Sequence, residues 1–274
     1  MKAGIIGGTG KMGRLFGRVL ERAGYEVMVS GRSTPLTNTR LAGLCDLVIV
    51  SVPIRDTVPV IEEIAPVLTQ NQILCDLTSL KVAPVAAMMK SEAQVIGLHP
   101  LFGPTVSSLL HQTIIVCPAR ASEEAVSSLI DIFSREGAEC TLSTPDQHDR
   151  MMAVVQGLTH FVTLCMAESI RRLGIDITTT RAFTSPVYQI ELSLVGRLLS
   201  QDPSLYADIL QQNPYVAGVL STCTESAGDL REVIASKDPG RFSTLFLDDR
   251  RYLGPWCDEG MKTTDALIEC MVNR

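Results

Sequence analysis

The chain opens on the stretch Ile5-Ile6-Gly7-Gly8-Thr9-Gly10-Lys11-Met12-Gly13, which decides how the first half folds. Gly8, Gly10 and Gly13 fit the pattern G-x-G-x-x-G, with an apolar strand before it and a predicted helix over residues 12–23 after it. The first glycine of this pattern makes the tight turn, the second lets the backbone approach a pyrophosphate, and the third lets the helix pack on the strand. The anion then binds free N–H groups at the positive end of the helix. The stretch therefore predicts a dinucleotide-binding site.

The end of the next predicted strand, residues 26–30, indicates which dinucleotide binds. A site for NAD has a carboxylate there, which accepts a hydrogen bond from the ribose 2′-hydroxyl. This chain has Gly31 at that point, with Arg32 beside it and serines at positions 30 and 33. A guanidinium group suits a 2′-phosphate, so the sequence favours NADP over NAD. The predicted cofactor-binding residues are Gly8, Thr9, Gly10, Lys11, Met12, Gly13, Ser30, Arg32, Ser33 and Val52.

Composition and charge limit the class of protein further. The 274 residues carry a net charge of −6, which argues against binding to nucleic acid or to an anionic membrane surface. The eight cysteines form no C-x-x-C pair and several lie within apolar runs, as expected of buried thiols in a reducing compartment. No signal peptide and no run of eighteen apolar residues is visible, so we expect a cytoplasmic protein that does not span a membrane.

Apolar runs and helical patterns alternate along the first half of the chain. The runs lie at residues 3–6, 26–30, 47–52, 73–77, 95–98 and 113–117, and residues 138–142 are predicted to form a last strand. The runs show little polar alternation, which indicates strands buried on both faces and hence a parallel, doubly wound sheet. From residue 147 onward the pattern is mostly helical, with helices predicted over residues 147–173, 178–200, 204–212, 214–236, 238–252 and 256–271. We therefore predict an α/β fold, with an N-terminal Rossmann dinucleotide-binding domain over residues 1–144 and an all-α domain over residues 145–274. By analogy with proteins of this plan, the helical domain is expected to form a homodimer interface.

His99 is the strongest candidate for acid–base chemistry. It follows a buried strand and precedes Pro100, so its backbone is extended at the edge where doubly wound sheets bind ligands. Its unperturbed pKa of about 6.5 suits a base that works near neutral pH. Ser79 ends the neighbouring apolar run, where it can orient the imidazole. The alternative is a histidine that only ends a strand, and spacing alone does not separate the two interpretations.

Three further polar residues have more than one interpretation. His160 lies on a predicted helix. It is either a core histidine with its hydrogen bonds made, or a side chain that faces the ligand-binding cleft from the helical domain. Arg197 lies in an otherwise apolar helix, where an arginine usually extends to solvent or pairs with a carboxylate, although a substrate carboxylate is also a suitable partner. His148 is followed by Asp149 at the start of the long helix, which favours capping and pairing over catalysis.

Together these motifs resemble the prephenate dehydrogenase family, and most closely the dehydrogenase half of the bifunctional chorismate mutase–prephenate dehydrogenases. The resemblance covers most of the chain and rests on the order and spacing of several motifs. These are Ile49-Val50-Ser51-Val52-Pro53-Ile54, Asp76-Leu77-Thr78-Ser79-Leu80-Lys81, Gly97-Leu98-His99-Pro100-Leu101-Phe102-Gly103-Pro104, His148-Asp149, His160-Phe161, Ser185-Pro186-Val187-Tyr188, Glu191-Leu192, Gly196-Arg197-Leu198, Gln201-Asp202 and Leu205-Tyr206-Ala207-Asp208. No chorismate mutase segment precedes the glycine motif, so we expect a dehydrogenase alone.

The resemblance implies the oxidative decarboxylation of prephenate to 4-hydroxyphenylpyruvate, as in tyrosine biosynthesis, with a nicotinamide cofactor and no metal. His99 matches the histidine that accepts a hydrogen bond from the ring hydroxyl, and Ser79 matches the serine that orients the ring chemistry. Arg197 matches the arginine that holds a substrate carboxylate, and His160 matches a histidine near the substrate pocket. Lys81, in the same motif as Ser79, is expected to support this substrate-binding site. The implied partner is a small anionic cyclohexadienyl substrate.

Two departures from the family pattern leave other substrates open. Gln189 and Thr159 stand where relatives can have arginines, and fewer cations disfavour a keto acid carboxylate. Arogenate and 4-amino-4-deoxyprephenate, which carry amines, are therefore alternative substrates. A different NADP reductase on the same plan, such as an imine or pyrroline reductase, and a non-catalytic NADP-binding sensor are the rival functions.

Overall fold

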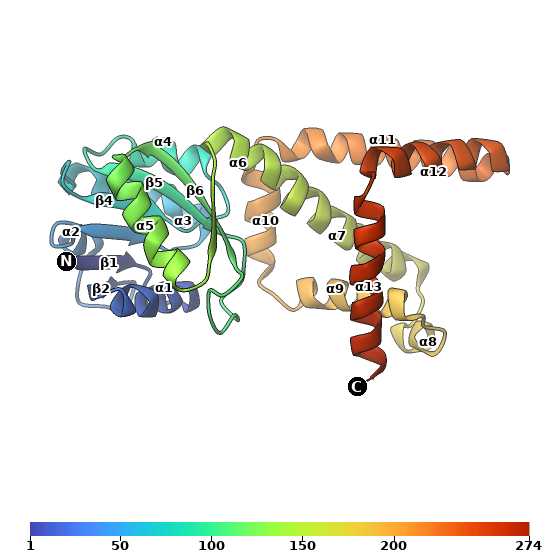
Figure 1. The fold of residues 1–274 in the computed structure, drawn as a ribbon, viewed down its shortest axis with the longest axis horizontal. Helices are drawn as coiled ribbons and strands as arrows, with labels where there is room; N and C mark the ends of the chain where they lie inside the picture. Colours follow the sequence, from blue (N-terminus) through green and yellow to red (C-terminus); the bar gives the residue numbers. More distant parts are fainter. Residues whose placement is uncertain (274) are drawn as a thin grey trace. The chain divides into compact units, whose positions relative to one another are not determined.

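Seven strands form one sheet in the order β2-β1-β3-β4-β5-β6-β7 (Figure 1). The structure is a computed structural model that describes residues 1–273. The strands are β1 (Lys2–Ile6), β2 (Glu26–Ser30), β3 (Leu47–Val50), β4 (Ile73–Asp76), β5 (Gln94–Pro100), β6 (Thr113–Arg120) and β7 (Glu139–Leu142). The apolar runs of the sequence predict each of these strands to within a few residues at its ends.

Helices make up most of the remaining described chain. Those of the first half are α1 (Lys11–Arg22), α2 (Asn38–Ala42), α3 (Ile54–Ile64), the 3₁₀ turn η1 (Ala65–Val67), α4 (Val82–Met88) and α5 (Glu123–Arg135). Those of the second half are α6 (Pro145–Met152), the π turn η2 (Ala153–Leu158), α7 (Thr159–Leu173), α8 (Ile177–Ala182), α9 (Pro186–Leu199), α10 (Pro203–Gln212), α11 (Val216–Ser236), α12 (Pro239–Leu253) and α13 (Trp256–Val272).

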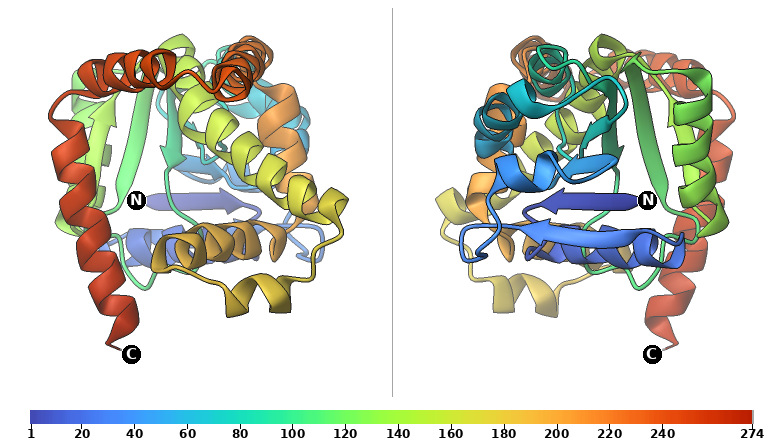
Figure 2. Two further views of the ribbon diagram at one scale, coloured as in Figure 1. Left: turned by 90° about the vertical axis from the view of Figure 1, so that its right-hand side faces the viewer. Right: turned by 90° about the vertical axis from the view of Figure 1, so that its left-hand side faces the viewer.

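Helices cover both faces of the sheet through two separate apolar layers. On one face α1 and α5 pack together through Phe16 and Phe133, whose ring centroids are 5.6 Å apart in an edge-to-face arrangement. On the other face α2, α3 and α4 bury Leu41, Ile61 and Met88 against the strands. The central strands are therefore buried on both sides. Figure 2 shows the twist of the sheet, from the dark blue β1 across the view to the upright green β6.

The sheet is parallel except at one pair, where β6 runs antiparallel to β5. The connection between them, residues 101–112, contains no helix, so the chain turns back at the same edge of the sheet. The expectation of an all-parallel sheet is wrong at this pair. The predicted α/β class, with a Rossmann sheet followed by a helical C-terminal region, is confirmed.

Two predicted long helices are interrupted. The stretch 178–200 divides into α8 and α9, because Pro186 begins α9 and the Ser185 hydroxyl accepts a hydrogen bond from the Tyr188 N–H. The stretch 147–173 widens into the π turn η2 between α6 and α7. Such turns are rare and are frequent at functional sites.

Two units make up the chain. The first contains residues 1–156 and 204–216, so α10 belongs with the sheet although it follows α9 in sequence. Arg55 of α3 donates a hydrogen bond to Asp208 of α10 at 3.0 Å, which ties this returning segment to the sheet. In the second unit, residues 157–203 and 217 onward, α9 packs on α7 and on α13. The domain boundary near residue 144 stays a prediction.

One helical stretch, Pro145–Leu173, is long and apolar enough to cross a membrane by length and composition. This is weak evidence, since a core helix of a folded protein passes the same test. The first turns of the stretch bury His148 and Met152 within the first unit. The expectation that no segment spans a membrane stays a prediction.

Candidate active site

The glycine motif forms the turn between β1 and α1, where side chains would collide with the backbone. Gly7 has a φ of +82°, so the tight turn is made by Gly7 and not, as the motif predicts, by Gly8. A Cβ atom at Gly13 would lie 2.7 Å from the carbonyl oxygen of Gly7. Gly13 thus lets α1 pack against the turn, as the sequence predicts. A Cβ atom at Gly8 would lie 2.5 Å from the side chain of Val29 on β2.

The start of α1 is suited to an anion. Gly10 is its N-cap residue and supplies no side-chain hydrogen bond, and the first turn holds no acidic residue. The N–H groups at the helix start are therefore free of side-chain caps, at the positive end of the helix. Thr9 and Lys11 are exposed at this turn, and Val52 packs beside Gly7.

The loop after β2 carries an exposed arginine and no carboxylate. The carbonyl oxygen of Ser30 accepts a hydrogen bond from the Gly7 N–H at 2.8 Å, which joins the loop to the glycine turn. The hydroxyl of Ser30 is buried and donates to Asn38 at 2.9 Å, so this predicted cofactor residue directs its side chain into the loop. Arg32 and Ser33 are exposed. Within residues 1–273, the Arg32 side chain has no hydrogen bond or ion pair.

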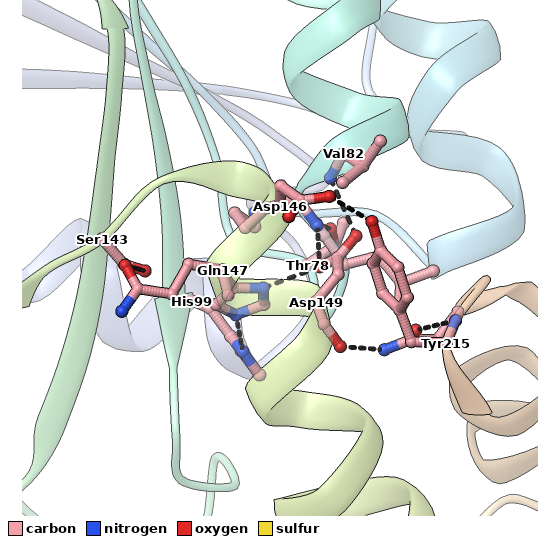
Figure 3. A network of polar contacts seen from close by, with 12 residues as sticks. Thr78, Val82, His99, Ser143, Asp146, Gln147, Asp149 and Tyr215 are labelled. Carbon is pink, nitrogen blue, oxygen red and sulfur yellow. Dashed lines mark hydrogen bonds and ion pairs between the residues drawn. The ribbon is translucent and has the colours of Figure 1, made fainter. Parts of the chain in front are cut away.

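Two imidazoles and a carboxylate form a hydrogen-bonded chain that ends at the carboxyl edge of the sheet (Figure 3). Nδ1 of His99, near the end of β5, lies 2.8 Å from Nε2 of His148 on α6. Nδ1 of His148 lies 2.7 Å from Oδ1 of Asp149. The Asp149 carboxylate also accepts hydrogen bonds from the N–H groups of Lys81 and Val82 at the start of α4, at 2.8 and 2.9 Å. We call His99, His148 and Asp149 the histidine chain.

Burial keeps the imidazole of His99 neutral. His99 and His148 are each 2% exposed. Burial, together with the nearby His148 and Lys81, holds the pKa of His99 well below its ordinary value. Burial also lowers the pKa of His148, although the hydrogen bond to Asp149 opposes that shift. The histidine chain uses Nδ1 of His99, and Nε2 lies 3.5 Å from the amide nitrogen of Gln156 in the π turn.

A buried ion pair supports the strand that carries His99. Lys81 Nζ pairs with the Asp76 carboxylate and donates a hydrogen bond to the carbonyl oxygen of Leu98 at 2.7 Å. The Thr78 hydroxyl donates to the same carboxylate at 2.8 Å. Neither charged side chain has any exposed surface, so the ammonium group of Lys81 has no surface for the expected substrate contact. Lys81 instead supports the site from within the fold.

The segment that returns to the first unit holds α6 in place. The amide of Asn213 donates to the carbonyl oxygen of Asp149 at 2.8 Å. The hydroxyl of Tyr215 donates to Asp146, and the guanidinium group of Arg150 lies 4.4 Å from the Tyr215 ring centroid. Figure 3 shows Asp146 and Tyr215 beside Asp149. The orientation of the histidine chain thus depends on β5, α4, α6 and the segment after α10.

The other predicted site residues are divided between the two units. Ser79 is half-buried after β4, and within residues 1–273 it makes no hydrogen bond to His99, whose Nδ1 is bonded to His148. His160 on α7 and Arg197 on α9 belong to the second unit. Burial lowers the pKa of His160, while Arg197 is exposed. The catalytic and binding roles of these three residues stay predictions.

Sequence reasoning missed that His148, Asp149 and Gln156 gather at His99. The pairing of His148 with Asp149 was predicted and is confirmed. One signal was present, because His148, Met152 and Gln156 are spaced by four residues and so favour one face of a helix. The contact of that face with the end of β5 joins residues 49 positions apart, and no local pattern indicates it.

The fold and the site define a Rossmann-type protein with a buried histidine pair at the edge where such sheets bind their ligands. The family described as "Prephenate dehydrogenase, nucleotide-binding domain" matches residues 30–142, and the one described as "Prephenate dehydrogenase, dimerization domain" matches residues 144–247. The chain therefore belongs to the prephenate dehydrogenase family, as its motifs predict.

Named relatives agree with this assignment. A protein of Methanocaldococcus jannaschii named "Probable arogenate/prephenate dehydrogenase" is 34% identical over 96% of this chain, and the T-protein of Haemophilus influenzae is 32% identical over 97%. The chain spans 64% of the length of the first and 70% of the second. A Synechocystis arogenate dehydrogenase structure, 18% identical, has the same fold, with a TM-score of 0.73 over 93% of this chain and 100% of that one.

Proposed function

We propose that this chain catalyses the NADP-dependent oxidative decarboxylation of prephenate to 4-hydroxyphenylpyruvate, a step of aromatic amino acid biosynthesis. The observation that carries the proposal is the Nε2 atom of His99. It belongs to a buried, neutral imidazole, and the histidine chain leaves it available at the carboxyl edge of the sheet that bears the glycine turn. The family assignment supports the same class of reaction.

The glycine turn and the loop after β2 fit a nicotinamide dinucleotide. The uncapped start of α1 supplies N–H groups for the pyrophosphate, and Arg32 supplies a guanidinium group for the 2′-phosphate of NADP. The carboxylate of Glu63 accepts hydrogen bonds from Asn38 and Thr39 at the start of α2, at 3.0 and 3.4 Å, so it is engaged and does not replace the carboxylate of an NAD site. When bound, the nicotinamide takes up the hydride that leaves the ring carbon.

The residues of the first unit supply the proton chemistry. His99 Nε2 accepts the proton of the ring hydroxyl as the carbon that bears it becomes a carbonyl carbon. The bond between the ring and its carboxylate then breaks, carbon dioxide leaves, and the electron pair enters the ring, which becomes aromatic. His99 returns its proton to the ring oxygen, so the product is a phenol. The Gln156 amide, 3.5 Å from Nε2, is a donor for the same oxygen.

Arg197 is the group proposed to hold a substrate carboxylate, with His160 near it and Ser79 orienting the ring. Arogenate is the second candidate substrate, because the Methanocaldococcus jannaschii relative is named for both compounds. A Streptomyces pristinaespiralis relative, 25% identical, is named 4-amino-4-deoxyprephenate dehydrogenase and supports that compound as a third candidate.

We further infer a cytoplasmic homodimer formed through a helical domain of residues 145–274. The matched family description for residues 144–247 names a dimerization domain, and the gap between the two family matches lies beside the proposed boundary at 144. Phe183, Tyr252 and Trp256 of the second unit are 87%, 90% and 60% exposed, which favours a partner surface there.

A substrate panel tests the function. Purified protein is mixed with prephenate, arogenate or 4-amino-4-deoxyprephenate, each with NAD or NADP, and cofactor reduction is followed by absorbance. We expect prephenate with NADP to give the highest kcat/KM. Tight NADP binding without reduction on any of the three would contradict the proposal and favour a non-catalytic sensor. The His111→Asn variant, altered in an exposed loop residue with a φ of +57° that asparagine tolerates, serves as the activity control.

A further inference from the structure

The histidine chain has a direction, which its hydrogen bonds define. Backbone N–H groups can only donate, so both Asp149 oxygens act as acceptors toward Lys81 and Val82. The carboxylate therefore accepts from His148 as well, which requires a proton on Nδ1 of His148. A neutral imidazole carries one proton, so Nε2 of His148 is an acceptor.

The same donor–acceptor argument determines which nitrogen of His99 carries the proton. Since Nε2 of His148 accepts, the atom that faces it at 2.8 Å, Nδ1 of His99, must carry the proton. Nε2 of His99 is then left unprotonated. The amide nitrogen of Gln156 lies at that atom as a donor, which matches an acceptor there. Every link in the series, from Asp149 through both rings to Gln156, thus has one donor and one acceptor.

We propose that His148 and Asp149 are positioning residues that hold the proton of His99 on Nδ1 and so keep Nε2 free to accept the hydroxyl proton of the substrate. The proposal rests on the proposed function of His99 as the base. It goes beyond it, because it assigns the tautomer of the base to two residues on another element. Asp149 does not take the proton in this scheme. Its carboxylate sets the direction of the chain and stabilises the charge when His99 becomes an imidazolium.

The surroundings favour this role over simple packing. Asp149 is 1% exposed and receives donors from two backbone N–H groups and one ring, while Asn213 fixes its carbonyl oxygen. An acid held by the backbone in this way cannot turn to offer a different atom to His148. A buried histidine that served only to fill space would not need its second nitrogen to meet the ring of His99 at 2.8 Å.

The tautomer can be measured in the free protein, without substrate. Protein labelled with 15N at histidine is studied by long-range 1H–15N correlation NMR at pH 7.5, with His99→Asn and His148→Gln variants to assign the signals. We expect His99 and His148 both to carry the proton on Nδ1. A proton on Nε2 of His99 would overturn the proposal. This measurement does not depend on turnover, so it separates the tautomer from the proposed reaction.

Two substitutions at His148 separate the effect of its hydrogen bonds from the effect of its size. His148→Gln keeps an acceptor for His99 and a donor for Asp149, whereas His148→Leu removes both. We expect kcat of His148→Leu to fall about 100-fold, with KM within about twofold of the unmodified protein, and His148→Gln to recover most of the loss. Equal kcat values for His148→Leu and the unmodified protein would overturn the proposal.

An isosteric change at Asp149 removes the feature that sets the direction of the chain. Asp149→Asn leaves the N–H group of either Lys81 or Val82 without an acceptor. Where the amide nitrogen takes the Oδ1 position it donates to His148, which then donates to His99 and leaves its proton on Nε2. A wrong tautomer behind a catalytic histidine costs up to about 10⁴-fold in kcat in the serine proteases, so we expect a loss of at least 100-fold here. The NMR signal of His99 should move to the Nε2-protonated form in the same variant. Thermal unfolding checks that the variant folds, and an unchanged tautomer in a folded, fully active variant would contradict the proposal.

Discussion

The glycine turn and the histidine chain lie at the same edge of one sheet, but they are built by different means. The glycine turn is a local structure, in which residues 7–13 position one another through the backbone and through missing side chains. Arg32, the charge proposed to select the cofactor, lies in the neighbouring loop after β2 and is exposed. The histidine chain is buried, its members come from β5 and α6, and backbone N–H groups at the start of α4 donate to it. The glycine turn is therefore determined by its local sequence motif, and the histidine chain by tertiary contacts.

The two regions should therefore respond differently to mutation. A buried group that loses its partner bears the full penalty of being left unpaired, whereas an exposed group can exchange its partner for water. Substitutions in the histidine chain, or in the Lys81–Asp76 ion pair that supports β5, should have large effects on turnover or on stability. Substitution of the exposed arginine should have a smaller effect that is confined to one cofactor.

The largest effect is expected for His99→Asn. Asparagine can replace the Nδ1 donor toward His148, but it has no counterpart of Nε2 and cannot take up a proton at neutral pH, so kcat should fall by about 10²–10⁴-fold. KM should change by less than about threefold, because the proposed contact of Arg197 with the substrate carboxylate is kept. Steady-state kinetics with NADP measures both quantities. A variant that stays active would instead favour an imine or pyrroline reductase, which does not need this base.

The next largest effect is expected on stability, for a substitution in the buried ion pair of Lys81 and Asp76 that supports β5. In Lys81→Met the Asp76 carboxylate stays buried with only the Thr78 donors, so the free energy of unfolding should fall by about 3–5 kcal/mol. Urea unfolding measures the loss. The matched control is Lys90→Met, which breaks an exposed pair with Glu62 and should leave stability unchanged within error. Equal losses in the two variants would contradict the supporting role of Lys81.

Sequence reasoning could predict the glycine turn because its causes are local. The pattern of Gly8, Gly10 and Gly13 required a turn and a close helix, and the absence of an acid after β2 can be read directly from the residues. The exception is Gly7, whose positive φ makes the turn one residue earlier than the motif suggests. Sequence also predicted the position of His99 at the end of a buried strand and the pairing of His148 with Asp149, both of which follow from neighbouring residues.

The links between these parts could not be predicted in the same way. His99 meets His148 only because α6 packs at the end of β5, and Asn213 reaches Asp149 only because the segment after α10 returns to the first unit. Such contacts depend on tertiary packing and not on local spacing. The burial of Lys81 is a further case, since a lysine in a motif of site residues gives no sign that its ammonium group is enclosed.

Acid should destabilise the protein through the histidine chain. Burial depresses the folded-state pKa of both His99 and His148, so below pH about 6.5 the unfolded chain binds protons that the folded chain does not. The free energy of unfolding should therefore fall as pH falls, by up to about 1.4 kcal/mol per pH unit for each histidine, and stay level above pH 7 with respect to these groups. Lys81 opposes protonation of both rings, while Asp149 favours that of His148.

Urea unfolding at pH 7.5, 6.5 and 5.5 measures this dependence, in a range that avoids most carboxylate titration. The His99→Asn variant is the matched comparison, because it removes one of the two groups and should show a smaller decrease between pH 6.5 and 5.5. An identical pH dependence in the variant would show that His99 is not held neutral by burial.

The smallest effect is expected at the exposed arginine of the cofactor loop. Arg32→Ala removes the proposed partner of the 2′-phosphate, and because this group is solvated the loss should be about tenfold in kcat/KM with NADP, or about 1.4 kcal/mol. The kcat/KM with NAD should change by less than about twofold, since the arginine has no phosphate to contact there. Arg40→Ala, at an exposed arginine of the neighbouring α2, is the matched control and should affect neither cofactor. An equal loss with both cofactors in Arg32→Ala would mean that this residue acts on the shape of the loop, and the preference for NADP would then need another cause.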